Sequence, residues 1–275
     1  MTATPIPRTL SLTLYGDLDV SVIDELPPGR TPVRTQLVFP DQREALWTLV
    51  RRELDSGRQV YVVCPLVEES EALQAASATA VFEKLKAGEL AGYHLALLHG
   101  QLPSSDKRAA MQAFHSGTVA VLVCTTVIEV GIDVPNASVM VIEGARRFGL
   151  SQLHQLRGRV GRGAAASRCL LLVEGDDPDT LARLALFART TDGFRLAEAD
   201  LRARGEGQLF GVRQSGLGDL RVARLLQDKR LLLAARSAAS HLLQLDPELR
   251  EPLHNLLGQA VEERFGEVVH WLDKA

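Results

Sequence analysis

Cysteine is scarce in this chain, and its few copies are poorly placed for a metal site or a disulfide framework. Cys64, Cys124 and Cys169 each lie inside an apolar run and far from one another in the sequence. Zinc sites and disulfide-stapled domains need cysteines at short, regular spacings. We therefore expect three buried free thiols, a reducing compartment and no metal site.

Long apolar runs are also missing. No run reaches the ~20 residues of a membrane-spanning helix, and the first residues lack the pattern of a secretory signal. We expect a cytoplasmic protein that acts without a membrane. Aromatic residues make up only 5% of the 275 residues, which leaves few platforms on which nucleobases could stack.

Lysine is the third residue in short supply. The chain has 31 basic residues but only five lysines, and none of these follows a glycine. A P-loop requires Gly-Lys-Ser/Thr, so this chain contains no phosphate-binding loop of that kind. Most of the positive charge is arginine, whose planar guanidinium suits bidentate phosphate contacts. Because the net charge is −3, any anion-binding surface must be local.

What the chain does have is an alternation of short apolar runs and helical patterns. The expected strands are 33–39, 60–65, 93–98, 119–124, 138–143 and 168–173, and the expected helices are 41–56, 68–87, 103–116 and 151–160. Several runs are apolar throughout, as strands buried on both faces are. The alternation predicts a parallel α/β sheet that binds ligands at the carboxyl ends of its strands. Beyond residue 175 the pattern is helical, over 178–245 and 247–274, broken by a glycine-rich stretch at 205–218.

Polar residues follow the expected strand at 119–124. In TTVIEVGIDVP (125–135), the hydroxyls of Thr125 and Thr126 can bond phosphate oxygens. Gly131 permits a close backbone approach, and Asp133 can accept from a hydroxyl or a water. A strand that simply ends in a turn would have a similar sequence, so both interpretations stay open for this segment.

Arginine is concentrated in SQLHQLRGRVGRG (151–163). Arg157, Arg159 and Arg162 lie among three glycines. Glycine costs a helix about 1 kcal/mol relative to alanine, which suggests backbone that approaches a ligand. Arginines placed near a helix terminus can neutralise the charge that develops in phosphoryl transfer. The alternative is a solvated basic helix face.

Four segments together resemble motifs III, IV, V and VI of superfamily 2 helicases, in that order. They are TATPIPRT (2–9), VVCPLVEES (62–70), TTVIEVGIDVPNAS (125–138) and QLRGRVGR (155–162). The segment LLHGQLPSSDKRAAMQAFHSG (97–117) narrows the resemblance to the RecG family of branched-DNA helicases. TDGFRLAEADLRARGEGQLFGVRQSG (191–216) resembles the translocation motif of that family, with Glu206 and Gln208 in place of the usual proline and glutamate.

The resemblance implies a role for several residues. Those at the γ-phosphate of ATP would be Gln155, Arg159 and Arg162, with Arg162 as the arginine finger. Gly131 and Asp133 would also belong to the nucleotide site, and Asp133 would link it to the DNA. Residues in contact with DNA would be Thr125, Thr126 and Gln214. Residues that couple the two sites would be Thr2, Thr4, Arg183 and Arg204, the last two by holding a helical hairpin together.

The implied architecture is an α/β fold with a RecA-like parallel sheet flanked by helices, followed by a helical hairpin and C-terminal helices. Residues 1–30 would be the tail of a first motor domain with its linker, and 31–175 the second RecA-like domain. Residues 176–217 would form the hairpin and loop of the translocation motif, and 218–275 the C-terminal helices.

The implied activity is that of a monomeric ATP-dependent DNA translocase. It would regress stalled replication forks and branch-migrate Holliday-type junctions in recombination and repair. ATP with Mg²⁺ would be bound mainly by the first motor domain, which together with a wedge domain would be the intramolecular partner of this chain. Because the chain has neither a P-loop nor a DExH box, we expect no ATP hydrolysis by the chain alone. Two alternatives stay open: a translocase of the transcription-repair coupling factor type, and a catalytically dead module that docks DNA or a helicase.

Overall fold

A computed structural model describes residues 31–65, 71–126, 133–163, 165–193, 195–196, 199–200 and 229–272. The chain forms two compact units. The described residues up to Asp200 belong to the first unit, and those from Lys229 belong to the second.

The first unit contains a six-stranded sheet in which every neighbouring pair of strands is parallel. Its strands are β1 (Arg34–Val38), β2 (Gln59–Val63), β3 (Leu95–Leu98), β4 (Val121–Cys124), β5 (Ala137–Ile142) and β6 (Arg168–Leu172). Their order across the sheet is β1-β6-β5-β2-β4-β3. All six expected strands are confirmed. The central strands β2, β4 and β5 are buried along their whole length, which accounts for their uninterrupted apolar sequences.

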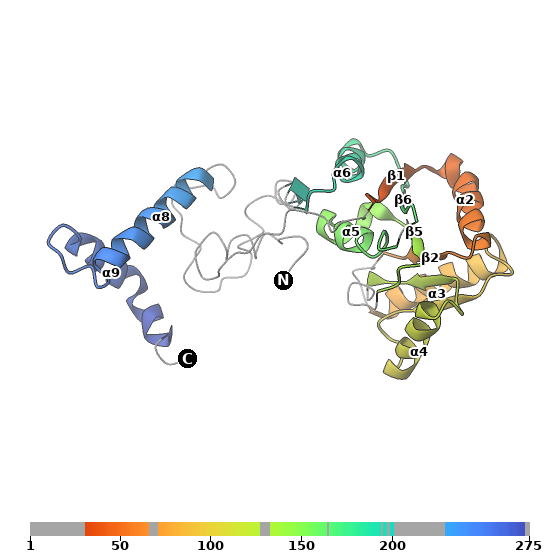
Figure 1. The fold of residues 1–275 in the computed structure, drawn as a ribbon, viewed down its shortest axis with the longest axis horizontal. Helices are drawn as coiled ribbons and strands as arrows, with labels where there is room; N and C mark the ends of the chain where they lie inside the picture. The colour runs from red at the N-terminus through yellow and green to blue at the C-terminus, as the bar shows by residue number, and fades with distance from the viewer. Residues whose placement is uncertain are drawn as a thin grey trace. The chain divides into compact units, whose positions relative to one another are not determined.

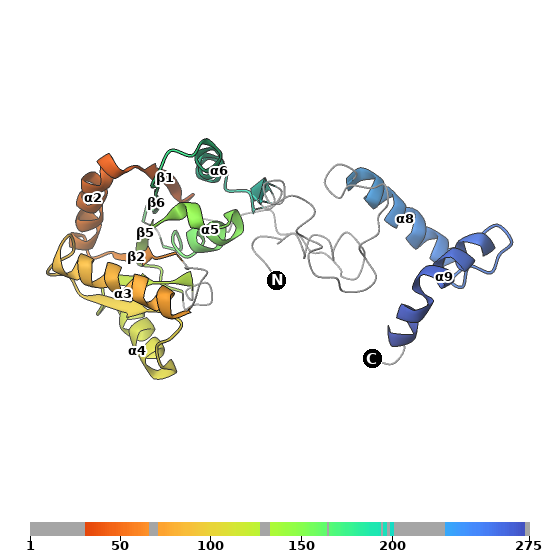
Figure 2. The ribbon, with the colours of Figure 1, turned by 180° about the vertical axis from the view of Figure 1, so that it is seen from behind.

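Helices cover both faces of this sheet (Figures 1 and 2). On one face, α2 (Arg43–Asp55) and α3 (Glu71–Ala87) pack through residues such as Trp47 and Leu85. On the other face, α4 (Ser104–His115), α5 (Leu150–Arg157) and α6 (Pro178–Arg189) pack through Phe114, Leu153 and Phe187. The four helices expected between residues 41 and 160 and the parallel α/β class are therefore confirmed.

A turn follows α6, and the chain is helical again from Gly193 in the residues that the structure describes. Thr190 has an extended conformation, with φ −119° and ψ 140°, which ends α6. Leu196 is completely buried in the same core as Leu184 and Phe187. This agrees with the hairpin that the sequence predicts around residues 191–193.

The second unit contains α8 (Lys229–Leu245) and α9 (Asn255–Leu272). The prediction of a helix from residue 247 is wrong, because α9 begins only at Asn255. The Asp246 carboxylate accepts from the N–H groups of Arg250 at 3.1 Å and Glu251 at 2.9 Å, and this holds the connection in a turn. Leu249 has a positive φ of 53°, which no helix accommodates.

The described residues contain no helix that is long and apolar enough to cross a lipid bilayer. Within the same ranges, no three His, Cys, Asp or Glu side chains gather as ligands of a metal ion. Cys64, Cys124 and Cys169 are buried free thiols, as predicted. Burial raises the pKa of Cys64 and of Cys169 to about 12, so these thiols are uncharged at neutral pH.

Candidate functional site

Helix α5 packs on the face of the sheet that also carries α4 and α6. It follows β5 after a 3-10 turn at Ala145–Arg147, and its Leu150, Leu153 and Leu156 are completely buried. These leucines recur every third residue, so they occupy one face of the helix. Gln155 is partly exposed. The residues that follow α5 lie near Val33 and Pro135, which precede β1 and β5 at the amino ends of the strands.

Arg157, the first of the three clustered arginines, is a structural residue. It is only 5% exposed, and its Nη1 donates to the carbonyl oxygens of Phe187 and Thr190, each at 3.0 Å. Its guanidinium also lies 4.2 Å from the centre of the Phe187 ring, a cation–π contact. These carbonyls belong to the C-terminal end of α6, where the helix dipole favours a positive charge. Arg157 therefore fastens α5 to α6.

His154 supports Arg157 as a hydrogen-bond acceptor. Its Nδ1 lies 3.1 Å from Nη2 of Arg157. Burial first, and then the charge of Arg157, lower the pKa of His154 to about 4. At neutral pH the ring is uncharged, so Nδ1 accepts from the guanidinium and Nε2 carries the proton. A solvated basic face, the alternative for this segment, is therefore wrong for its first half.

Arg162 has a different environment, with 32% of its side chain exposed. Its Nη1 pairs with Oδ1 of Asp133 at 3.1 Å, and its Nε donates to the Gly158 carbonyl at 3.0 Å. Asp133 is itself 55% exposed, so the pair contributes on the order of 1 kcal/mol or less. Two residues assigned to one nucleotide site from the sequence are thus in contact, through an ion pair that a more highly charged anion could replace.

Arg159 and Arg162 act on the same buried phenol. Tyr61 of β2 is 1% exposed, and its ring centre lies 4.8 Å from that of Phe114. Burial raises the pKa of Tyr61 well above its usual value, whereas the charges of Arg159 and Arg162 lower it. Both guanidinium groups therefore lie within electrostatic range of the centre of the sheet.

The glycines between the arginines serve the packing of the protein itself. A Cβ on Gly161 would lie 2.6 Å from Cγ2 of Val33, and a Cβ on Gly163 would overlap the carbonyl oxygen of Pro135. Gly161 also has a φ of 76°, which a side chain disfavours. The sequence suggested that these glycines let backbone approach a ligand. In the described residues, the close approach is to the loops that hold Val33 and Pro135.

The two threonines after β4 differ in exposure. Thr125 is 1% exposed, and its N–H donates to the Leu98 carbonyl at 3.1 Å, which extends the pairing of β3 with β4. Thr126 is partly exposed. Of the two, Thr126 has the surface that a phosphate from outside could contact.

Arg183, in the first turns of α6, binds the segment that precedes α5. Its Nη1 donates to the Phe148 carbonyl at 2.6 Å, and its Nη2 donates to the Arg146 carbonyl at 2.8 Å. Arg183 therefore joins α6 to the chain entering α5, while Arg157 joins α6 to the end of α5.

A separate charged cluster lies where β5 and β6 end. Arg43 at the start of α2 pairs with Glu143 at 3.3 Å and with Glu174 at 3.0 Å. Burial raises the pKa of Glu143, and the charge of Arg43 acts in the opposite direction. The cluster ties the start of α2 to the ends of two strands.

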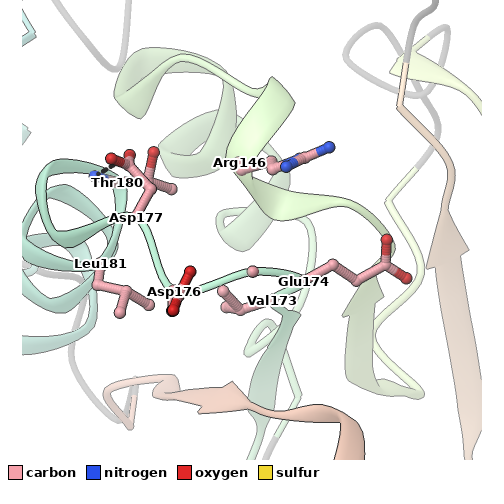
Figure 3. A pocket seen from close by; sticks show the side chains of 8 residues that line it. Arg146, Val173, Glu174, Asp176, Asp177, Thr180 and Leu181 are labelled. Carbon is pink, nitrogen blue, oxygen red and sulfur yellow. Dashed lines mark hydrogen bonds between the residues drawn. The ribbon is translucent and has the colours of Figure 1, made fainter.

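Next to this cluster is a cavity of about 340 Å³ (Figure 3). Its charged lining is Arg146, Glu174, Asp176 and Asp177. Asp177 caps α6 by accepting from the Thr180 N–H at 2.9 Å. With three carboxylates and one guanidinium, the cavity would repel a triphosphate, and we do not assign the nucleotide to it.

Five residues with roles implied by the resemblance lie outside the described residues: Gly131, Gln214, Thr2, Thr4 and Arg204. The described members of the set are Gln155, Arg159, Arg162, Asp133, Thr125, Thr126 and Arg183. Among them, the structure brings Arg162 and Asp133 into contact and places the second half of the arginine segment beside Val33 and Pro135, at the amino ends of β1 and β5.

One residue at this site was missed in the sequence. Asp200 is 4% exposed, and its Oδ1 accepts from the N–H of Leu150, the first residue of α5, at 3.2 Å. The signal that could have indicated it is Gly149 at the N-cap of α5. Glycine has no side chain with which to cap a helix, so a cap must come from elsewhere.

Two family descriptions match this chain. Residues 41–164 match the helicase conserved C-terminal domain, and residues 190–273 match the C-terminal part of domain 3 of the ATP-dependent DNA helicase RecG. The first contains β2 to β5 with α5 and its arginines. The second contains Asp200 and the two helices of the second unit.

Individual proteins are similar over most of the chain. The RecG helicase of Acidithiobacillus ferridurans is 51% identical over 98% of this chain, which spans 39% of that protein. The RecG helicase of Synechocystis sp. is 52% identical over 90% of this chain and 30% of its own length. A solved structure of RecG bound to a three-way DNA junction matches with a TM-score of 0.66 and 47% identity, over 84% of this chain and 30% of that one. The chain thus spans between 30% and 39% of the length of these relatives.

Proposed function

Because this chain belongs to the RecG family of ATP-dependent DNA helicases, we propose that it provides the second motor domain and the coupling hairpin of a DNA translocase. The observation that carries the proposal is the exposed pair of Arg162 with Asp133, next to the amino ends of the strands of a RecA-like sheet. A guanidinium held by an exposed carboxylate and one backbone carbonyl can move to the phosphate of a nucleotide presented by another domain.

The nucleotide would be ATP with Mg²⁺, bound mainly by a first motor domain. ATP supplies the phosphoryl group whose transfer to water drives translocation. In this chain, Arg162 would act as the arginine finger, with Arg159 and Gln155 beside it on the same segment. Asp133 and Gly131 would complete the site, and release of Asp133 from Arg162 would accompany nucleotide binding. The partial exposure of Gln155, Arg159 and Arg162 fits an incoming phosphate.

The substrate would be branched DNA, such as a stalled fork or a Holliday-type junction. Support comes from the similarity to a RecG protein whose structure was solved with a three-way junction. Thr125, Thr126 and Gln214 would contact the sugar–phosphate backbone. Such contacts carry no sequence preference, and their affinity falls steeply with salt concentration.

The chain alone would not hydrolyse ATP, because it contains no Gly-Lys-Ser/Thr sequence. We define the full-length helicase as this chain preceded by the rest of a RecG protein. The full-length helicase should release phosphate from ATP when junction DNA is added and should unwind the junction, whereas the chain alone should do neither.

The contradicting result is phosphate release by the chain alone that Arg162→Ala abolishes. If the full-length helicase also failed to hydrolyse ATP while it bound DNA, the chain would be a docking module instead. The match of residues 190–273 to a RecG domain favours RecG over the transcription-repair coupling factor. The first motor domain and the wedge of the same protein would be the partners of this chain, in a monomer.

Coupling between hydrolysis and movement would depend on the hairpin. Arg183 and Arg204 would hold the two helices of the hairpin together, and Gln214 would contact the duplex. Thr2 and Thr4 would transmit the movement of the first motor domain to this chain. In the full-length helicase, Arg204→Ala or Gln214→Ala should leave most DNA-stimulated ATP hydrolysis but abolish junction unwinding. Equal loss of both activities would make the hairpin a purely structural element.

A further inference from the structure

The buried carboxylate of Asp200 provides the cap that α5 lacks. An α-helix leaves its first N–H groups without partners, and a side-chain oxygen at the N-cap usually accepts from one of them. The N-cap of α5 is Gly149, which has no such oxygen. Oδ1 of Asp200 accepts from the N–H of Leu150 at 3.2 Å instead. A carboxylate at this position is also favoured by the positive end of the helix dipole.

This cap comes from the second helix of the hairpin, far along the chain from α5. Asp200 follows Leu196 and Ala199, and both pack into the core that contains Leu153 and Phe187. The second helix is therefore anchored against the same core as α5. Asp200 is 4% exposed, so water competes little for the bond between it and the N-terminus of α5.

The other end of α5 is bound to the hairpin as well. Arg157, the last residue of α5, donates to the carbonyls of Phe187 and Thr190 at the end of α6. With eight residues, α5 is about 12 Å long. A helix this short with a polar contact at each end moves with the hairpin as one body. Arg159 and Arg162 follow Arg157 directly and are carried with it.

We propose that Asp200 is a positioning residue that transmits movement between the hairpin and the arginines of α5. Its carboxylate keeps the N-terminus of α5 on the second hairpin helix, so a shift of Arg159 and Arg162 on nucleotide binding also shifts the hairpin. The inference rests on the proposed function and adds to it a specific residue. Local capping by a residue next to α5 would stabilise the helix equally but would not connect it to the hairpin.

The test uses Asp200→Ala in the full-length helicase, with Ser151→Ala as the matched control. Ser151 is the second residue of α5, and its buried hydroxyl has no hydrogen-bond partner. Ser151→Ala therefore removes an oxygen from the same helix end without removing a bond. DNA-stimulated ATP hydrolysis, junction unwinding and the thermal unfolding midpoint are measured for each protein.

Asp200→Ala should keep ATP hydrolysis within about threefold but lower the base pairs unwound per ATP by about tenfold or more. Ser151→Ala should match the parent in both. Gly149→Ser, added to Asp200→Ala, supplies a local cap, because Gly149 has φ −68° and ψ 155°, which serine adopts freely. This second change should restore the unfolding midpoint, while the number of base pairs unwound per ATP hydrolysed should stay low.

Two results would overturn the proposal. One is an unchanged ratio of unwinding to hydrolysis in Asp200→Ala. The other is recovery of that ratio by Gly149→Ser, which would reduce Asp200 to an ordinary cap. If Asp200→Ala did not fold even with Gly149→Ser, the residue would serve folding and the proposal would also fail. A parent protein without DNA-stimulated hydrolysis would refute the proposed function instead, and so the two failures are distinguishable.

Discussion

The two halves of the segment from Leu150 to Gly163 differ in how they hold their arginines. In the first half, Arg157 is 5% exposed and donates to two carbonyls at the end of α6. In the second half, Arg162 is 32% exposed and is held by an exposed carboxylate and one carbonyl. The first half binds the protein to itself, and the second half presents positive charge at the edge of the sheet.

This difference shows that burial, more than residue type, decides what an arginine does. A buried guanidinium must have its donors satisfied by the protein, because water cannot reach them. Once satisfied, it has nothing to offer a ligand. An exposed guanidinium in a weak ion pair can exchange its partner for a phosphate. The comparison can be tested by changing each half separately and measuring activity and stability for both.

The largest effect should come from Arg162→Ala in the full-length helicase. If Arg162 is the arginine finger, DNA-stimulated ATP turnover should fall by roughly 10³- to 10⁵-fold. The affinity for junction DNA should change little, and the unfolding free energy should stay within about 0.5 kcal/mol, because the side chain is partly exposed. Turnover within a few-fold of the parent would contradict the assignment, and Arg159 would become the candidate.

Arg157→Ala should have the opposite effect. It should lower the free energy of unfolding, because Arg157 is a structural contact, and should remove no group from the nucleotide site. It leaves the carbonyls of Phe187 and Thr190 and the Nδ1 of His154 without their donor. We expect the unfolding free energy to fall by about 3 kcal/mol. Urea denaturation of this chain measures the change, and Arg162→Ala is the control. A loss below about 1 kcal/mol would show that Arg157 does not fasten α5 to α6.

The glycines of this segment should also differ from one another in how much stability an alanine substitution costs. A Cβ on Gly163 would overlap the backbone carbonyl of Pro135, and backbone cannot move aside cheaply. Gly163→Ala should destabilise the chain by about 2 kcal/mol. Gly158→Ala is the matched control, because a Cβ there would lie 3.3 Å from the Gln155 carbonyl and the residue has a helical φ of −66°. Its cost should be below about 1 kcal/mol. Equal costs would mean that packing at Pro135 does not fix the path of the chain.

An effect similar in size to that of Gly163→Ala should be the pH dependence contributed by His154. Its pKa is about 4 in the folded chain and about 6.5 in the unfolded chain, so the unfolded chain binds more protons between these values. The contribution to stability is therefore complete above pH 6.5 and falls as the pH drops toward 4. We expect a loss of about 2 kcal/mol, less than the full shift implies, because the ring is partly exposed.

His154→Gln is the control for this pH dependence, because glutamine can still accept from Arg157 but does not titrate. The difference in unfolding free energy between the two proteins should change only between pH 6.5 and 4. A constant difference across that range would show that His154 is already protonated, or solvated, in the folded chain.

Most of the fold could be predicted from the sequence, because its signals are local. The runs 60–65, 119–124 and 138–143 are apolar throughout and correspond to strands buried on both faces. The expected start of a helix at 247 failed for an equally local reason that periodicity does not detect. There, the Asp246 carboxylate binds two backbone N–H groups and holds a turn.

The candidate site could be predicted only in part. The sequence by itself determined the order of the elements, the family and the segment that carries the arginines. Hydrophobic periodicity and short sequence motifs are sufficient to identify each of them. Only the tertiary structure decided that Arg157 is buried while Arg162 meets Asp133, and that Asp200 caps α5. The physical reason is that these contacts join residues far apart in the sequence, such as Arg157 with Thr190 and Leu150 with Asp200. No pattern along the chain shows which distant carbonyl or carboxylate will lie next to a given side chain once the chain has packed.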